Sequence, residues 1–185
     1  ADAFRSIGLD RRRALWEARR LPDDAPLPLF AARDVDDTGK EHAADLPVMA
    51  PSEHVVADYQ TLRLSLKAHP LRFLRPLFSH EGLVTCRAVA RARDGMRARC
   101  AGLVLVRQRP GSAKGVVFMT LEDETGIANV VVWPAIMARF RRQVMGSRLV
   151  EVDGRIQRSP EGVVHLIADR LVDRRDVRAT GLLRR

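Results

Sequence analysis

The sequence predicts a mainly β protein with α-helical appendages, and three observations in its second half support that prediction. Apolar and polar residues alternate, as they do in half-buried strands, in five segments: 97–109, 116–122, 127–133, 148–158 and 163–172. One helical segment, 134–146, follows the third of these. Turn-forming residues separate the strands. The expected order is therefore three strands, a helix and two strands.

Each element has its own boundary signals. The first strand, RARCAGLVLVRQR, ends at Pro110-Gly111, and the turn 123–126 joins VVFMTLE to IANVVVW. Pro134 suits the first position of the helix, and Gly146 suits its end. The turn 159–162 joins the last two strands, RLVEVDGRIQR and VVHLIADRLV. This is the order of a five-stranded OB-fold barrel, whose helix closes one end. A generic small β-barrel is the alternative.

A helix and a linker begin the chain. Residues 1–21 predict a short helical segment, with Asp10 as the N-cap. The segment 22–51 contains five of the ten prolines, seven acidic residues and two basic ones. Such an acidic, Pro-rich composition indicates a flexible linker.

A second helical segment connects this linker to the barrel. Residues 52–92 predict two helices, one capped by Ser52 and a shorter one that begins near Pro70. Two helices are too few to form a domain, so we expect them to pack on a neighbour. We assign 93–176 to the barrel and 177–185 to a basic tail.

The positive charge of the chain lies in its second half. Residues 1–83 contain 12 basic and 13 acidic residues, whereas residues 84–185 contain 20 basic and 10 acidic residues. A domain with such an excess, mostly of arginine, is expected to have an anionic partner. A basic surface without such a partner remains the alternative.

Several classes of function find no support in the sequence. No segment has the length and hydrophobicity of a membrane span, and no signal-peptide pattern opens the chain, so we expect a cytoplasmic location. Cys86 and Cys100 lack metal-ligand spacing and are predicted to be buried thiols. No Ser-His-Asp or Walker-type pattern is present. Because the chain begins without Met, we expect a fragment or a processed product.

A family resemblance joins these observations. The runs AGLVLVRQRPGSAKGVVFMTLEDETGIANVVVWP and RLVEVDGRIQRSPEGVVHLIADRL resemble the OB-fold near the C-terminus of bacterial C-family DNA polymerases. The similarity is greatest to the error-prone paralogue of the DNA polymerase III alpha subunit. The upstream runs EHVVADY and LSLKAHPL resemble the helical connection in that family, and ADAF with IGLDRR resembles the end of its DNA-binding region. Arg63 departs from the pattern, since the family often has Gly there.

The resemblance implies a parent that is a DNA-directed DNA polymerase acting in translesion synthesis and DNA repair. The palm of that family, with paired aspartates that hold catalytic Mg²⁺, would lie upstream. We therefore expect no catalytic residue, metal site or cofactor in this chain. The expected partner is single-stranded DNA, and no membrane partner is expected.

Candidate nucleic-acid contacts follow from the way OB-folds bind along their second and third strands and the adjoining loops. Phe118 should point outward from the second strand and stack on a base. The predicted phosphate contacts are Arg107, Arg109, Lys114, Arg155 and Arg158. We interpret three helix arginines as a solvated face instead: Arg139, Arg141 and Arg142.

Other candidates have simpler explanations. Trp133 is expected to be core, because it precedes Pro134 and the helix. His165 is a lone histidine, and no chemical role is predicted for it. Glu122-Asp123-Glu124 is interpreted as a hairpin turn rather than a magnesium site. His80 and Cys86 do not complete a zinc site.

One segment predicts a different function. Leu27, Leu29 and Phe30 resemble the short peptide with which bacterial polymerases dock on the sliding clamp, although the usual leading Gln is missing. The second hypothesis is therefore a protein-interaction module that binds the clamp or accessory mutasome proteins. A third is an RNA- or tRNA-binding barrel.

Overall fold

A computed structural model describes residues 3–19 and 46–175. The chain divides into two compact units, with the boundary between Ser65 and Leu66. The second unit contains the predicted barrel. None of the helices in the described ranges is long and apolar enough to cross a membrane.

The first unit consists of short helices: η1 (Arg5–Ile7), α1 (Arg11–Arg19) and α2 (Pro51–Leu62). As predicted, the Asp10 carboxylate caps α1 and accepts a hydrogen bond from the Arg13 amide at 2.8 Å. The predicted Ser52 cap is wrong. Helix α2 begins earlier, with Pro51 in its first turn, and the Ala50 amide donates to the Glu53 carboxylate at 3.0 Å. Arg11 forms an ion pair with Asp58, which joins α1 to α2.

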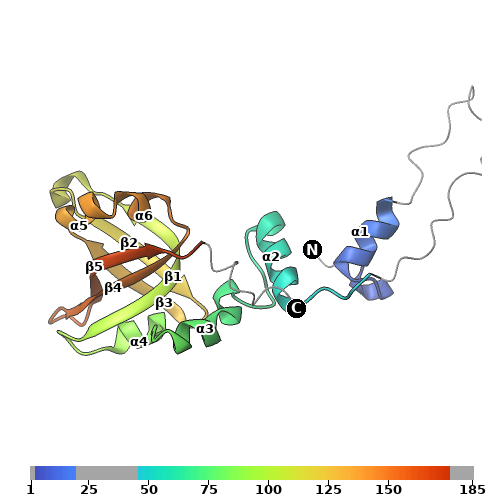
Figure 1. Cartoon of the computed structure of the whole chain (residues 1–185), viewed down its shortest axis with the longest axis horizontal. Helices are drawn as coiled ribbons and strands as arrows, with labels where there is room; N and C mark the ends of the chain where they lie inside the picture. Colours follow the sequence, from blue (N-terminus) through green and yellow to red (C-terminus); the bar gives the residue numbers. More distant parts are fainter. Residues whose placement is uncertain (1–2, 20–45, 176–185) are drawn as a thin grey trace, which may run out of the picture. The chain divides into compact units, whose positions relative to one another are not determined.

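Five strands form the closed barrel of the second unit (Figure 1): β1 (Arg97–Gln108), β2 (Val117–Asp123), β3 (Gly126–Val132), β4 (Leu149–Arg158) and β5 (Val164–Asp173). Their order around the barrel is β1-β2-β3-β5-β4, and only β3 and β5 pair in parallel. The barrel is mixed, and its strand order is that of an OB-fold. The five predicted strands are confirmed.

Two glycines allow the barrel to close. At Gly102, on β1, an added Cβ would lie 2.8 Å from the Leu121 Cβ. At Gly154, where the β4–β5 register shifts, an added Cβ would lie 2.0 Å from the Ile167 carbonyl oxygen. Because real Cβ atoms do not approach backbone so closely, only glycine fits at Gly154 without moving the strands.

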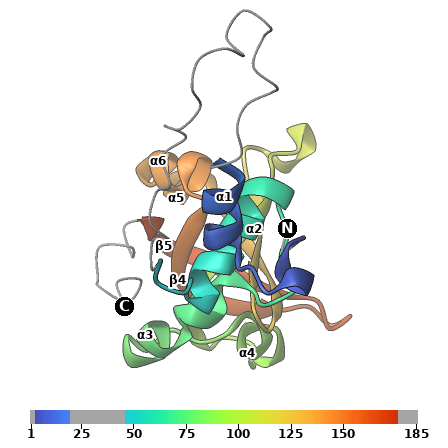
Figure 2. The same ribbon diagram turned by 90° about the vertical axis from the view of Figure 1, so that its right-hand side faces the viewer.

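Helices close the barrel at opposite ends (Figures 1 and 2). At one end lie α5 (Pro134–Arg139) and α6 (Arg141–Gly146), where one continuous helix was predicted; the helix breaks at Phe140, whose ψ is 30°. At the other end lies α4 (Cys86–Arg91), whose Cys86 and Val89 belong to the barrel core. The sequence did not predict α4 as a separate element.

A further helical layer covers part of the barrel's outside. It consists of η3 (Pro70–Phe73) and α3 (Arg75–His80), where a single helix was predicted. Leu71 and Phe78 are buried there against Ala101, a residue of β1 that faces away from the core. The second of the two predicted helices thus packs on a neighbour, the β1–β4 side of the barrel, whereas α2 belongs to the first unit.

Candidate nucleic-acid interface

The outer side of β2 and β3 has exposed side chains, among them Phe118, Asn129 and Trp133. Met119 and Leu121 point into the core, whereas Phe118 and Thr120 point outward, and the Phe118 side chain is 37% exposed. Phe118 pairs across the hairpin with Val131, and Thr120 pairs with Asn129. Phe118 therefore lies on an outer strip of uncharged side chains, in the orientation that the alternation predicts.

Trp133 adds a second aromatic ring to this strip. The prediction that it belongs to the core is wrong, because its side chain is 52% exposed. Its backbone remains extended after β3, with φ −69° and ψ 155°, so it continues the outward series of Val131. Since Val131 is the direct partner of Phe118, Trp133 is a diagonal neighbour of Phe118. Large side chains can reach each other across such a diagonal.

The strand register places a cation on the same outer row. Phe118 pairs with Val131, Val131 with Ile167, and Ile167 with Arg155. Arg155 is exposed, and the described part of the chain offers it no carboxylate partner. An aromatic ring and a guanidinium group thus face outward on one row around the barrel.

The β1–β2 loop forms a basic rim at the end of this strip. It contains η4 (Gly111–Ala113), followed by Lys114 with a positive φ of 46°. Arg109 and Lys114 are both exposed. Neither forms an ion pair with any residue in the ranges that the structure describes, so both are available to an anion.

Arg107 does not lie where the sequence suggested. It pairs with the core residue Met119, so its side chain points toward the barrel end rather than the outer strip. Its guanidinium donates to the Val144 carbonyl at 2.6 Å and also to the Ser147 carbonyl, at the C-terminus of α6. Burial lowers the pKa of Arg107. The group therefore caps a helix in this structure, and phosphate binding by it stays a prediction.

Arg158 makes the corresponding contacts at the other end of the barrel. Its guanidinium donates to the carbonyls of Ala90 and Ala92 at 3.2 Å and 3.0 Å, at the C-terminus of α4. Its amide donates to the Asp94 carboxylate at 2.8 Å. Cations at helix C-termini satisfy carbonyls that have no partner within the helix. The binding role predicted for Arg158 is likewise still a prediction.

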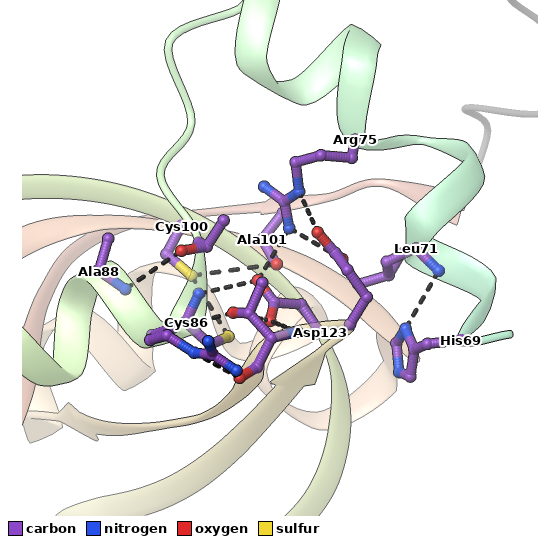
Figure 3. A network of polar contacts seen from close by, with 12 residues as sticks. His69, Leu71, Arg75, Cys86, Ala88, Cys100, Ala101 and Asp123 are labelled. Atoms are coloured by element: carbon purple, nitrogen blue, oxygen red, sulfur yellow. Dashed lines mark hydrogen bonds and ion pairs between the residues drawn. The ribbon is translucent and has the colours of Figure 1, made fainter.

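A buried carboxylate holds the β2–β3 turn against the helices (Figure 3). Asp123 is 2% exposed and accepts hydrogen bonds from the Thr125 hydroxyl at 2.6 Å and from the Cys86 amide at 2.8 Å. Arg75 of α3 donates to Asp123 at 2.8 Å and to Glu124 at 2.5 Å. One carboxylate thus connects the hairpin with α3 and with the start of α4.

This network favours an ionised Asp123. Burial acts to raise the pKa of this carboxyl, but hydrogen bonds from Thr125 and the Cys86 amide, together with nearby Arg75, outweigh it and hold the pKa below its ordinary value. Of residues 122–124, which the sequence assigned to a turn, Glu122 and Asp123 end strand β2 and only Glu124 lies in the turn. The described residues contain no group of three or more His, Cys, Asp or Glu side chains arranged to hold a metal ion.

Of the remaining candidates, the two cysteines lie in the core, and His165 lies on the outer side of β5, two residues before Ile167. Cys86 and Cys100 are free and buried, with their Sγ atoms 3.6 Å apart. Hydrogen bonding with Cys100, together with burial, raises the pKa of the Cys86 thiol. His165 lies half-buried on β5. The predicted clamp peptide, with Leu27, Leu29 and Phe30, lies outside the described residues.

Comparison with known proteins agrees with the topology of the barrel. Residues 98–173 match the family model described as an OB-fold nucleic acid binding domain. The barrel is an OB-fold. The match covers β2 and β3 together with the loops that flank them.

Nearly the whole chain is similar to error-prone DNA polymerases. It is 70% identical over 94% of its length to that of Rhodopseudomonas palustris strain BisB5, of which it covers 16%. It is 68% identical, also over 94%, to that of Bradyrhizobium sp. strain ORS 278 and covers 15% of it. For that of Brucella abortus the identity is 62%, with 94% of this chain and 16% of the relative covered. The predicted resemblance is confirmed, for a segment that spans about a sixth of these relatives.

Two solved structures are similar to part of the chain. An asparaginyl-tRNA synthetase from Pyrococcus horikoshii is 26% identical, with a TM-score of 0.42 over 49% of this chain and 22% of its own. The second OB-fold domain of replication protein A from Methanococcus maripaludis is 16% identical, with a TM-score of 0.37 over 47% of this chain and 92% of its own.

Proposed function

We propose that this OB-fold binds single-stranded DNA within an error-prone DNA polymerase and holds the template for synthesis across damaged bases. The observation that supports this proposal is the outer strip of β2 and β3. Phe118 and Trp133 face outward on it, among uncharged neighbours. Arg109, Lys114 and Arg155 stand around it, each exposed.

The chemistry of the strip suits a single strand better than a duplex. Stacking requires a base with a free face, and each stacked base contributes about 1–3 kcal/mol. Guanidinium and ammonium groups at the rim can then contact the phosphates between stacked bases. In a duplex the bases already stack on each other and are not available to Phe118 and Trp133.

The proposed role is positioning rather than bond making. The catalytic aspartates and Mg²⁺ of such a polymerase would belong to the remainder of the parent protein, which would act in the cytoplasm. The barrel would keep the template near that site and so increase the number of nucleotides added for each binding event.

Binding at the rim can be tested with a labelled oligothymidylate and fluorescence anisotropy over a range of salt concentrations. Arg109→Ala/Lys114→Ala should weaken binding and flatten the salt dependence, by about 0.7 in the log–log slope for each phosphate interaction removed. Arg91→Ala/Arg93→Ala removes the same charge from exposed positions at the α4 end and serves as the control. No measurable affinity at low salt, or equal decreases in the two variants, would contradict the proposal.

The two other hypotheses are separate outcomes of related experiments. Equal affinity for an oligoribonucleotide and an oligodeoxynucleotide would favour an RNA-binding barrel. A pull-down of the sliding clamp that is abolished by Leu29→Ala/Phe30→Ala, in a protein that does not bind DNA, would favour an interaction module.

A further inference from the structure

The segment that contains α5 and α6 carries positive charge and no acidic residue of its own. The segment 134–148 contains four arginines and no acidic residue. All four are exposed: Arg139, Arg141, Arg142 and Arg148. Within the ranges that the structure describes, no carboxylate pairs with any of them. We call these four residues the α5–α6 arginine cluster.

Several arginines elsewhere on this unit are paired with carboxylates, whereas others, such as Arg109 and Arg155, form no such pair with the described residues. Arg75 pairs with Asp123 and Glu124, Arg97 with Asp153 and Asp169, and Arg99 and Arg174 with Glu151. The α5–α6 arginine cluster forms no such pair with any described residue, and unpaired like charges repel each other and destabilise the folded state.

The position of two residues of the cluster in a helix adds to this destabilisation of the folded state. Arg141 and Arg142 stand in the first turn of α6, which contains no acidic residue. The helix dipole disfavours cations at this end. The helix dipole therefore does not stabilise these two arginines, whereas an anionic ligand would.

The cluster continues from the proposed DNA-binding strip. Pro134, the first residue of α5, directly follows the exposed Trp133. A Cβ added at Gly115 would lie 3.5 Å from the Arg109 Nη2 and 3.7 Å from the Pro134 Cγ, so the rim cation Arg109 lies close to the start of α5.

The helix end beside this cluster does not oppose an anion. The guanidinium of Arg107 covers the C-terminal carbonyls of α6, which would otherwise present negative charge. A DNA strand that passes Trp133 would therefore meet cations from the β1–β2 loop and then from α5 and α6.

We propose that the α5–α6 arginine cluster binds the phosphodiester backbone of the strand after it leaves the β2–β3 strip. The guanidinium group suits this ligand because its planar donors match two phosphate oxygens at once. This inference rests on the proposed function. It replaces the solvated face expected from the sequence with a second phosphate-binding surface that extends the length of DNA bound.

Strand length separates the two surfaces experimentally. The full chain is titrated into oligothymidylates of about 6 and about 20 nucleotides, within and beyond the usual site size of one OB-fold. Arg141→Gln/Arg142→Gln should weaken binding of the longer strand about tenfold near 0.1 M salt and flatten its salt slope by about 0.7 for each arginine. Binding of the shorter strand should not change. Arg91→Gln/Arg93→Gln, at the opposite end of the barrel, is the charge-matched control.

The outcomes distinguish this inference from the function on which it rests. If Arg141→Gln/Arg142→Gln leaves the longer strand bound as tightly as the wild type does, or if the control weakens it equally, the inference is wrong. In that case, loss of short-strand binding in Trp133→Ala would still support the proposed function. If the wild-type protein binds neither strand, both fail.

Discussion

Two outer faces of the same barrel carry apolar side chains, and among the described residues the helical layer of η3 and α3 packs on only one of them. On β1 and β4, Ala101, Leu103 and Leu149 lie beneath η3 and α3, and Phe78 fills this interface with an exposure of 0%. On β2 and β3, Phe118 lies on the surface, and Trp133 extends the face beyond the end of β3.

The difference shows how one fold can use the same kind of surface in two ways. An apolar strand face is unfavourable in water unless something covers it. On the β1–β4 side the chain supplies the cover, with an ion-paired Glu151 at 6% exposure among the apolar residues. On the β2–β3 side the proposed cover is a nucleic-acid strand, whose bases would take the place that α3 occupies on the other side.

The largest expected loss of stability comes from a substitution that disrupts the barrel and therefore both of its faces. In Gly154→Ala the new Cβ would lie 2.0 Å from the Ile167 carbonyl oxygen, so β4 and β5 would have to separate. We expect a loss of at least about 4 kcal/mol in the free energy of unfolding, measured by urea denaturation. Gly146→Ala, with no atom within 4 Å of the added Cβ, should be close to wild type. Equal stabilities of the two variants would show that the β4–β5 pairing tolerates a side chain.

The next effect separates the two faces. Phe78→Ala opens a cavity beneath α3 and removes the ring that contacts the Arg75 and Arg174 guanidinium groups, at 6.0 Å and 5.6 Å from its centroid. We expect a loss of about 4 kcal/mol in stability, with DNA affinity preserved while the protein remains folded.

Phe118→Ala is the matched change on the open face. It should cost about 1 kcal/mol or less in stability and instead lower the affinity for DNA. If Phe118→Ala were as destabilising as Phe78→Ala, the open face would be part of the core packing, and the comparison between the faces would fail.

Substitution of the buried Asp123 should have a smaller effect on stability, and that effect should depend on pH. Asp123→Ala leaves the largely buried Arg75 with fewer partners, and we expect a loss of about 3 kcal/mol at neutral pH. The folded-state pKa of Asp123 lies below its ordinary value, so its ionisation stabilises the fold above about pH 4. That contribution is lost as the pH falls through the folded-state pKa.

Denaturation of wild type and Asp123→Asn at several pH values checks this sign. The difference in stability between the two proteins should shrink as the pH falls below about 4. Asp173, whose pKa is also lowered by Arg175, is present in both proteins and cancels in the difference. A difference that is constant over this range would mean that Asp123 does not titrate with a lowered pKa in the folded protein.

The strands were predictable because side chains point alternately into and out of the barrel, which gives apolar and polar residues a period of two along the sequence. The same period correctly placed Phe118 outward. It fails at Arg107, because a β-bulge between Val104 and Val106 shifts the register of β1, so that Arg107 pairs with the core residue Met119. The helix-capping contacts of Arg107 and Arg158 could not be predicted, because their carbonyl partners lie 37 and more residues away in the sequence.

Other features were missed for local reasons. Helix α4 has only six residues, CRAVAR, and too few apolar positions for a helical period to be recognised. The prediction for Trp133 followed the usual burial of tryptophan, although its place in the alternation of β3 indicated the outer side. The Asp123 network depends on tertiary contacts with α3 and α4, which no local pattern records.

The central claim is that the open face binds DNA by stacking, and the affinity of a short oligothymidylate for aromatic variants tests it most directly. We predict that Phe118→Ala/Trp133→Ala weakens binding by at least about tenfold, since each stacked base contributes about 1–3 kcal/mol. Trp133→Phe, which keeps a ring at that position, should retain most of the affinity. Unchanged affinity in the Phe118→Ala/Trp133→Ala protein, with its fold intact, would contradict the account.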